Sequence, residues 1–354
     1  MSVFDNAAFE RHERVVHCTD PVSGLRAIIA VHSTHRGPAA GGCRLWHYAN
    51  ANDAVTDVLR LSQGMSYKNA MAGLDLGGGK AVIMADPSQD VTEDQLRAFG
   101  RFVETLRGSY ITAEDVGMTV EAMQIIASET RHVAGLPPEA GKAGGDPSPK
   151  TADGVFHGIR AAVAYRLERD SLEGLRVAVQ GVGHVGANLC KALHDAGAKL
   201  WVADINESRV EHMCDAYGAR PLPLDEIITA DVDVVAPCAL GAVLNAKTIA
   251  GLRTSIVAGA ANNQLATDQD GQLLFNAGVL YAPDYVINAG GIINVACEYS
   301  ASASDAEVDQ RVEEIGARLK AIFEQSERLE VPTNVIADEM AKGLIGRGAG
   351  TKAH

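Results

Sequence analysis

Short apolar runs alternate with longer amphipathic segments in the second half of the chain. Strands are predicted at residues 175–181 and 199–204, where apolar side chains follow one another. Residues 183–197 between them, and residues 151–167 before them, repeat apolar positions at the spacing of an α-helix. Further short apolar runs follow at 231–237, 255–259 and 284–291. Strands that alternate with helices predict a mostly parallel sheet with helices on both faces.

The first half of the chain shows the same two kinds of pattern. Strands are predicted at 26–33, 80–86 and 109–112. A long helix is predicted over 50–70, and another helical run begins near Val120. The stripe of the long helix is formed by Val55, Val58, Leu59, Ser62 and Met65. This half is therefore expected to be a second α/β unit.

Residues 136–150, which are rich in proline and glycine, separate the two halves and are typical of a linker. At 354 residues the chain is longer than one core usually serves, which also favours two domains. We predict a first domain over 1–148 and a second over 149–330. The final residues, 347–354, are expected to form a frayed tail.

The composition excludes several classes of protein. Hydrophobic residues make up 47% of the chain and charged residues 21%, so a large core is feasible. The formal net charge of -14 argues against general binding to nucleic acids or to anionic membranes. Charges near the N-terminus interrupt the apolar run of a signal peptide, and no segment is apolar for the length of a bilayer span. A soluble, cytoplasmic protein is expected.

The cysteines and histidines form no pattern of a metal site or a disulfide framework. The six cysteines are far apart and lack C-x-x-C spacing, and the eleven histidines include no H-E-x-x-H. We therefore expect reduced thiols and no metal site.

A glycine pattern of the form G-x-G-x-x-G follows the strand at 175–181. Its glycines open the helix at 183–197, and Asp204 ends the next strand. In this context such glycines allow a tight turn, the approach of a pyrophosphate and close packing of helix on strand. Asp204 would accept hydrogen bonds from ribose hydroxyls and repel a 2′-phosphate, which favours NAD over NADP. A glycine-rich turn without a nucleotide is the alternative. The predicted dinucleotide-binding residues of this segment are Gly181, Val182, Gly183, His184, Val185, Gly186, Asp204 and Ile205.

Two lysines, Lys68 and Lys80, lie near a run of three glycines at 77–79. The run is not a phosphate-binding P-loop, because Leu74 stands at the position of its first glycine and Ala81 at that of its hydroxyl. Three glycines would remove side chains that keep a ligand away from Lys80. Spacing alone favours a solvated residue for Lys68, because it lies on a predicted helix.

Asp115 follows the predicted strand at 109–112 and precedes the helical run near Val120. A carboxylate at this place is either functional or a helix cap formed by Glu114 or Asp115. The local pattern leaves both readings open.

Seven motifs in this order resemble the family of glutamate, leucine, phenylalanine and valine dehydrogenases, and most of all its leucine-specific members. They are GPAAGGCR, LSQGMSYKNAMAGLDLGGGKAVI, SYITAEDVGMT, VAVQGVGHVGANLC, APCALGAVLN, VAGAANNQL and YAPDYVINAGGIINVA. The resemblance spans nearly the whole chain and implies NAD-dependent oxidative deamination of an L-amino acid to a 2-oxo acid and ammonium. It also implies an N-terminal substrate and oligomerisation domain, to which a C-terminal helix over 331–354 returns. A Rossmann-type doubly wound domain would face it across a cleft, with a hinge near Gly144 and Gly145.

The resemblance assigns roles to residues of the first domain. Lys80 would be the catalytic lysine, partly desolvated and close to another cation, which favours its neutral form as a base toward water. Asp115 would exchange protons with the substrate amine. Lys68 would hold the α-carboxylate of the substrate, helped by backbone N–H groups near Gly41 and Gly42. Asn262 would lie near both the substrate and the nicotinamide. Further positions that match dinucleotide contacts in relatives are Arg44, Thr151, Cys238 and Ala239.

The resemblance also identifies the pocket for the substrate side chain. Glutamate-specific relatives have a lysine where this chain has Ala40, so an unpaired substrate carboxylate would be buried here at a high cost. Ala113 and Ile292 leave less room than phenylalanine-specific relatives do, which favours leucine, isoleucine or valine. Ala40 is smaller than the leucine common in leucine-specific members, and it leaves phenylalanine or methionine open. The predicted pocket positions are Ala40, Met65, Ala113, Ile292 and Val295.

Two other classes of protein are less consistent with these residues. A non-catalytic NAD-binding module would not need Lys68, Lys80 and Asp115 together. A 2-hydroxyacid dehydrogenase would need a histidine base paired with a carboxylate, and no such constellation is evident. The expected partners are an amino acid, its 2-oxo acid and ammonium, in a homo-oligomer that binds neither nucleic acid nor membrane.

Overall fold

The computed structural model describes residues 2–137, 146–300 and 304–348. These residues fall into two compact units. Unit 1 contains residues 1–145, 295–305 and 341–354, and unit 2 contains residues 146–294 and 306–340. This division differs from the predicted one, because 295–305 belongs to unit 1 and 331–340 to unit 2. The predicted hinge at Gly144 and Gly145 lies outside the described residues.

Unit 1 is built on a five-stranded sheet in the order β1-β2-β4-β3-β5. Strands β3, β4 and β5 run parallel to one another, whereas β2 is antiparallel to both β1 and β4. The strands are β1 (Arg14–Asp20), β2 (Leu25–Ser33), β3 (Ala39–Trp46), β4 (Gly77–Met84) and β5 (Tyr110–Glu114). The strand predictions for β2, β4 and β5 are confirmed, although β4 begins three residues earlier than expected. Strands β1 and β3 were not predicted.

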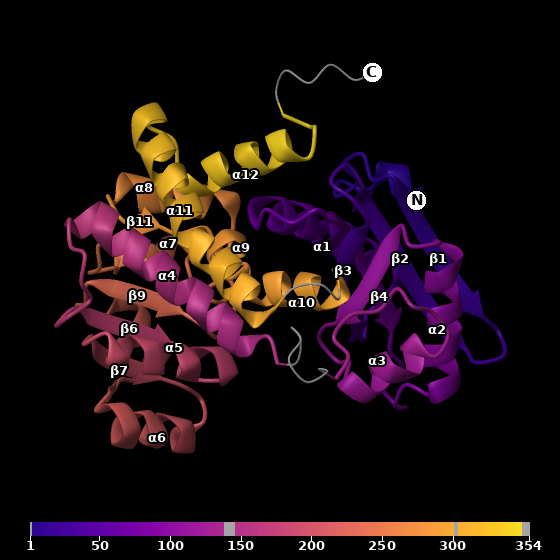
Figure 1. Cartoon of the computed structure of the whole chain (residues 1–354), viewed down its shortest axis with the longest axis horizontal. Coiled ribbons are helices and arrows are strands. Elements are labelled where there is room, and N and C mark those ends of the chain that lie inside the picture. Colours follow the sequence, from indigo (N-terminus) through magenta and orange to yellow (C-terminus); the bar gives the residue numbers. More distant parts are fainter. Residues whose placement is uncertain (1, 138–145, 301–303, 349–354) are drawn as a thin grey trace. The chain divides into compact units, whose positions relative to one another are not determined.

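Three helices cover the two faces of this sheet: α1 (Ala51–Met71), α2 (Glu93–Thr105) and α3 (Val120–Ala127). Helix α1 packs on one face, where Val55, Val58 and Leu59 join a buried cluster with Ile28 and Val82. Helices α2 and α3 form the core of the opposite face (Figure 1). The amphipathic pattern at 50–70 therefore predicted α1 correctly.

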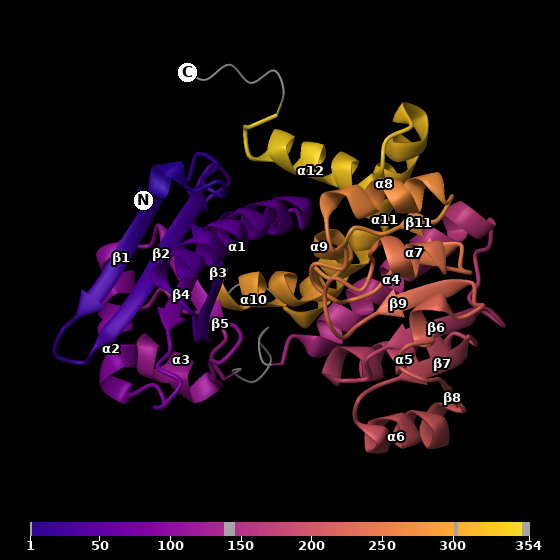
Figure 2. The ribbon, with the colours of Figure 1, turned by 180° about the vertical axis from the view of Figure 1, so that it is seen from behind.

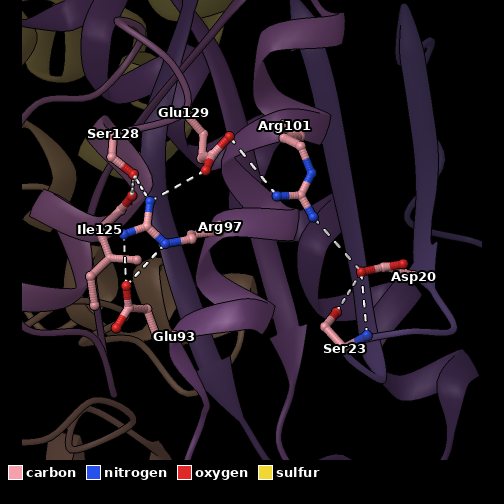
Figure 3. Close-up of polar contacts among 8 residues, drawn as sticks. All are labelled: Asp20, Ser23, Glu93, Arg97, Arg101, Ile125, Ser128 and Glu129. Carbon is pink, nitrogen blue, oxygen red and sulfur yellow. Dashed lines mark hydrogen bonds and ion pairs between the residues drawn. The ribbon is translucent and has the colours of Figure 1, made fainter.

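A network of surface ion pairs connects α2 with the end of α3 and with β1 (Figure 3). The Arg97 guanidinium lies 2.7 Å from a Glu93 oxygen and 3.3 Å from a Glu129 oxygen. Arg101 lies 3.9 Å from both Asp20 and Glu129. Exposed pairs of this kind each contribute little to stability, about 0 to 1 kcal/mol.

Unit 2 is built on a six-stranded, wholly parallel sheet in the order β11-β10-β9-β6-β7-β8. The chain starts in the middle at β6, moves outward through β7 and β8, and then returns to the other side of β6. This is the strand order of a doubly wound Rossmann fold. The strands are β6 (Arg176–Gln180), β7 (Lys199–Ala203), β8 (Arg220–Pro221), β9 (Val234–Pro237), β10 (Ile256–Val257) and β11 (Leu280–Tyr281).

Helices cover both faces of this sheet, as predicted. Helices α4 and α5 lie on the face seen in Figure 1. On the face turned to the viewer in Figure 2, Leu244, Ile249 and Leu274 pack against Ala178 and Val235 of the strands. The helices of this part of the chain are α4 (Ser148–Leu167), α5 (His184–Asp195), α6 (Glu207–Tyr217), α7 (Ala246–Ala250), α8 (Asp268–Asn276), α9 (Asp284–Ile287), α10 (Gly290–Ser300), α11 (Asp305–Leu329) and α12 (Thr333–Leu344).

Three local predictions need correction. The apolar run at 284–291 forms α9 and the start of α10 and adds no strand. Helix α4 begins at Ser148, inside the predicted linker. Arg347, which was assigned to a frayed tail, donates hydrogen bonds to the backbone oxygens of His32, Arg11 and Glu10. None of the described helices is long and apolar enough to cross a membrane.

Candidate functional site

The two predicted catalytic residues of unit 1 are in direct contact. Lys80 lies in the middle of β4 with only 8% of its side chain exposed, and its Nζ is 2.9 Å from Oδ2 of Asp115. Asp115 follows the last residue of β5, and its side chain is 21% exposed. The alternative that Asp115 caps the next helix is wrong, since the Thr119 side chain caps α3. Folding thus places a buried ammonium against a carboxylate.

The glycines before Lys80 serve close packing of the protein itself. A Cβ on Gly77 would lie 2.0 Å from the Ser33 backbone oxygen, and one on Gly78 would lie 2.0 Å from the Ser66 nitrogen of α1. The expectation that these glycines clear space for a ligand is therefore wrong. They let α1 and the neighbouring strands approach β4, which holds Lys80 in a rigid and buried backbone.

The glycine pair at 41 and 42 positions Asp115 in a similar way. Strand β3 pairs with β5 so that Gly42 faces Ala113. A Cβ on Gly42 would lie 2.7 Å from Cβ of Asp115, and one on Gly41 would lie 1.8 Å from the Gly79 oxygen. Any larger residue at position 42 would displace the carboxylate. Their predicted backbone contacts with a substrate carboxylate stay a prediction.

Arg44 of β3 bridges two carboxylates of unit 1. Its Nε is 3.3 Å from Oδ2 of Asp115, and its Nη1 is 3.1 Å from Oδ2 of Asp57 in α1. The same Asp57 oxygen accepts a hydrogen bond of 2.6 Å from the Tyr48 hydroxyl. The predicted dinucleotide contact of Arg44 stays a prediction. Sequence reasoning missed Asp57 and Tyr48; a charged residue between the buried Val55 and Val58 was the available signal.

Opposing effects set the ionisation of Asp115. Burial by itself raises the pKa of this carboxyl group, but the Lys80 ammonium and the Arg44 guanidinium outweigh it, and the pKa falls below its usual value. Asp115 is therefore a carboxylate at neutral pH. It can accept a proton from an amine placed beside it.

Three predicted pocket positions come together next to this ion pair. Ala40 and Ala113 belong to one buried apolar cluster with Ile111 and Ala134, and Val295 of α10 packs against it. Met65 also lies close, because a Cβ on Gly41 would be 3.0 Å from its Cγ. The residues that form this cluster are apolar.

Two further predicted residues take positions on helices. Ile292 precedes Val295 by one turn of α10 and belongs to unit 2. Lys68 is half-buried in the last turn of α1, the helix that packs on β4.

In unit 2, the glycine fingerprint has the conformation that a dinucleotide requires. Gly181 has a φ of +89°, and a Cβ there would lie 2.6 Å from Cβ of Ala239. A Cβ on Gly186 would lie 2.0 Å from the Gly181 oxygen. At Gly183 the nearest atom would be Nη1 of Arg209 at 3.8 Å, so the approach to this glycine is open.

The first turn of α5 is available to an anion. The helix begins at His184, directly after Gly183, and no side chain caps it. Val182, Gly183 and His184 line a cavity of about 390 Å³ together with Ser208, Arg209 and His212. Uncapped backbone N–H groups at a helix N-terminus form a favourable site for a phosphate. Sequence reasoning missed Arg209, which lies in the first turn of α6.

Asp204 lies at the carboxyl end of β7, beside this cavity. Its Oδ2 accepts a hydrogen bond of 2.7 Å from the Val182 backbone N–H, and its Oδ1 accepts one of 2.9 Å from Asn206. The next residue, Ile205, is 88% exposed. Asp204 is therefore fixed against the fingerprint loop, where the ribose carboxylate of a dinucleotide-binding domain is expected.

The remaining predicted contacts of unit 2 lie around the ends of its central strands. Cys238 and Ala239 follow β9, next to Gly181 and Gly186. The Thr151 hydroxyl of α4 would lie 2.7 Å from a Cβ on Gly291.

The exposed Asn262 accepts a hydrogen bond of 2.8 Å from Nδ2 of Asn288. Asn288 itself was not predicted. Its own Oδ1 is buried and finds no partner among the described residues, which marks it as a further group able to meet a ligand.

Comparisons with known proteins agree with this architecture. Residues 12–132 match the Glu/Leu/Phe/Val dehydrogenase dimerisation domain, and residues 146–208 and 202–340 match the Glutamate/Leucine/Phenylalanine/Valine dehydrogenase domain. The chain is 50% identical to leucine dehydrogenase of Bacillus subtilis, over 95% of this chain and 92% of that protein. It is 46% identical to valine dehydrogenase of Streptomyces virginiae, over 94% of this chain and 93% of that protein.

A solved structure extends the similarity to the fold. The crystal structure of L-tryptophan dehydrogenase from Nostoc punctiforme matches with a TM-score of 0.85 and 44% identity, covering 95% of this chain and 96% of that chain. Both domain models match in order along the described fold, and full-length relatives are close to half identical. The chain therefore belongs to the Glu/Leu/Phe/Val dehydrogenase family.

Proposed function

We propose that this protein oxidatively deaminates an apolar L-amino acid, with leucine preferred and isoleucine and valine accepted, and that NAD is its cofactor. The observation that carries the proposal is the buried contact between Lys80 and Asp115, 2.9 Å apart beside an apolar cluster. An acid–base pair next to an apolar pocket suits proton transfer on the amine end of an aliphatic substrate.

The residues of unit 1 would divide the work of the reaction. Asp115, ionised because Lys80 and Arg44 are close, accepts a proton from the substrate ammonium. Lys80, shielded from bulk water, acts in its neutral form as the base that takes a proton from the attacking water, and the ammonium so formed stabilises the charge of the intermediate. Lys68 holds the α-carboxylate of the substrate. When bound, the nicotinamide accepts the hydride from the α-carbon.

Several features of unit 2 fit a dinucleotide. The open face of Gly183 and the uncapped start of α5 would hold the pyrophosphate, and Asp204 would hold the adenine ribose. A carboxylate at the ribose favours NAD. Arg209 lines the same cavity and is a cation that would favour a 2′-phosphate, so NADP belongs in any test of this preference.

The apolar cluster around Ala40 and Ala113 supports the choice of substrate. Ala40 stands where the resemblance gives glutamate-specific relatives a lysine, so the side-chain carboxylate of glutamate would lack that partner among these apolar residues. Burying an unpaired carboxylate costs several kcal/mol, on the order of a pKa shift of several units. Relatives named for leucine and valine do not favour the phenylalanine alternative. One methylene in such a pocket changes specificity by about 1 to 3 kcal/mol, so overlap among branched substrates is expected.

The state of assembly is also part of the proposal. The match of unit 1 to a domain described as a dimerisation domain supports a homo-oligomer. We place the enzyme in the cytoplasm, where NAD and free amino acids are both present.

A substrate panel tests the proposal. NADH formation is measured with purified protein, NAD or NADP, and leucine, isoleucine, valine, methionine, phenylalanine, tryptophan or glutamate. We expect the highest kcat/KM with NAD and a branched-chain substrate, and no turnover of glutamate. A highest kcat/KM with an aromatic amino acid would overturn the pocket assignment. If no amino acid led to NADH formation, the proposed function would be overturned.

A further inference from the structure

A chain of alternating charges extends from Lys80 away from the proposed reaction centre. The ammonium of Lys80 and the Nε of Arg44 share one oxygen, Oδ2 of Asp115, at 2.9 and 3.3 Å. The other arm of Arg44 reaches Asp57 at 3.1 Å, and Asp57 accepts the Tyr48 hydroxyl at 2.6 Å. The four charged groups together carry no net charge. The balance of charge at Lys80 and Asp115 therefore depends on Arg44 and Asp57, which take part in no step of the proposed reaction.

These groups come from separate elements that the fold holds rigidly. Arg44 lies on β3, Lys80 on the adjacent β4, and Asp57 on α1, which packs over that side of the sheet. The Arg44 side chain is 24% exposed and that of Asp57 30% exposed, so solvent screens their interaction only in part. Two-point contact by a planar guanidinium fixes direction as well as charge.

We propose that Arg44, held by Asp57 and Tyr48, is a positioning residue that fixes the orientation of Asp115 and sets the pH at which Asp115 loses its proton. The inference rests on the proposed function for its kinetic consequence. The negative charge of Asp57 would partly offset the positive charge of Arg44 and so weaken the effect of Arg44 on the pKa of Asp115. Tyr48 would keep Asp57 in place through its hydroxyl.

The groups that face Asp115 can be named from each neighbouring element. Lys80 on β4 and Arg44 on β3 lower the pKa of Asp115 through their charge. Cys43 on β3, Tyr110 on β5 and Tyr48 after β3 are electrostatically coupled to it, and burial raises the pKa of all three, so they stay neutral at working pH. Changes of charge at Arg44 and Asp57 should therefore dominate the titration of Asp115.

Two substitutions in one ion pair should move the titration in opposite directions. Asp57→Asn leaves the Arg44 charge unopposed, and the pH at which kcat/KM rises to its plateau should fall by about half a unit. Arg44→Gln removes the cation, and the same limb should rise by about one unit or more. Arg44→Lys keeps the charge but not the two-point contact. In this variant kcat/KM should rise to its plateau at the same pH as in the wild-type protein, while kcat stays reduced. A role in folding alone would not produce this pattern.

A matched control comes from the surface network of Figure 3. Arg97 of α2 also bridges two carboxylates, Glu93 and Glu129, in a network that does not include Asp115 (Figure 3). Arg97→Gln should leave the pH profile and kcat unchanged. The affinity for NADH is measured in every variant. If Arg44→Gln acts mainly by weakening NADH binding, Arg44 is a cofactor contact and the inference is overturned.

A second readout does not require turnover. Protein labelled with [4-¹³C]aspartate is titrated by NMR, and the Asp115 carboxyl signal is identified by its loss in Asp115→Asn. The inference predicts that this signal titrates at lower pH in Asp57→Asn and at higher pH in Arg44→Gln. Shifts in one common direction, or no shift, would overturn it. If the wild-type protein oxidised no amino acid while the NMR shifts appeared as expected, the proposed function would fail and the inference would stand.

Discussion

At the scale of single residues, Gly78, which lies two positions before Lys80 and contacts α1, shows how tightly this site is packed. A Cβ at Gly78 would lie 2.0 Å from the backbone nitrogen of Ser66. Gly64, on the same helix as Ser66, has no atom within 4 Å of the corresponding position. A methyl group at Gly78 would therefore clash with the backbone of α1, whereas one at Gly64 would have open space.

We expect opposite effects on stability from alanine at these two positions. Gly78→Ala should lower the free energy of unfolding by about 1 to 3 kcal/mol or more, because α1 must move away from β4. Gly64→Ala should raise it by about 0.5 to 1 kcal/mol, because alanine favours an exposed helix. Urea unfolding of both variants provides the comparison, and equal stability of the two would contradict the packing argument.

The site residues that could not be predicted from the sequence share one physical property: their partners lie far away along the chain or on another element. Lys80 and Asp115 lie in distinct local patterns, so each could be identified before the fold was known. The charge of Asp57 between two buried valines was a local signal, but its partner is a guanidinium on another element, which no local pattern identifies. Tyr48 acts through Asp57. The same holds for Asn288, whose contact with Asn262 spans 26 residues of sequence.

At the scale of elements, the strand predictions succeeded for continuous apolar and β-branched runs such as β2 and missed β1, whose two valines are flanked by Arg14 and His17. Strand β3 was missed because its residues Ala39 to Gly42 are small, and its extended form is imposed by pairing with β4 and β5. Helix α9 was missed because a short apolar run is compatible both with a strand and with a helical turn.

The end of the chain is a further element whose role appears only in the structure. The Arg347 guanidinium donates a hydrogen bond of 2.6 Å to Nε2 of His32. Arginine cannot accept a hydrogen bond, so His32 must be neutral, with its proton on Nδ1 facing Ser66 at 2.7 Å. His12 lies against His32 with ring centroids 4.8 Å apart. Burial lowers the pKa of His12 to about 4 and that of His32 to about 3, from an ordinary value of 6.5.

This arrangement predicts a loss of stability in mild acid. Below the ordinary histidine pKa of 6.5 the unfolded chain takes up protons that the folded chain refuses, so the free energy of unfolding should fall from there toward about 4. Urea unfolding at about pH 7.5 and about pH 5 measures this difference. His32→Gln should reduce the slope, whereas His17→Gln, at an exposed position, should not. A wild-type stability that is constant over this range would contradict the neutral histidine pair.

At the scale of the whole molecule, the fold class and the presence of two α/β units could be predicted from alternating patterns. The doubly wound arrangement of unit 2 was implied by the family resemblance, and its strand order comes from the structure. The return of the C-terminal segment to unit 1 was implied by the resemblance, whereas the assignment of residues 295–305 to unit 1 was not predicted. Such returns depend on long-range packing.

The central claim is a division of labour in which unit 1 carries the acid–base chemistry and unit 2 carries the dinucleotide. The most direct measurement is the kinetics of Lys80→Ala with leucine and NAD, combined with its affinity for NADH. We expect kcat/KM to fall by about 10²- to 10⁴-fold while NADH binding stays unchanged. Lys320→Ala, at an exposed lysine of α11, should retain full activity. Near-normal turnover of Lys80→Ala would contradict the account, as would a loss of NADH binding equal to the loss of turnover.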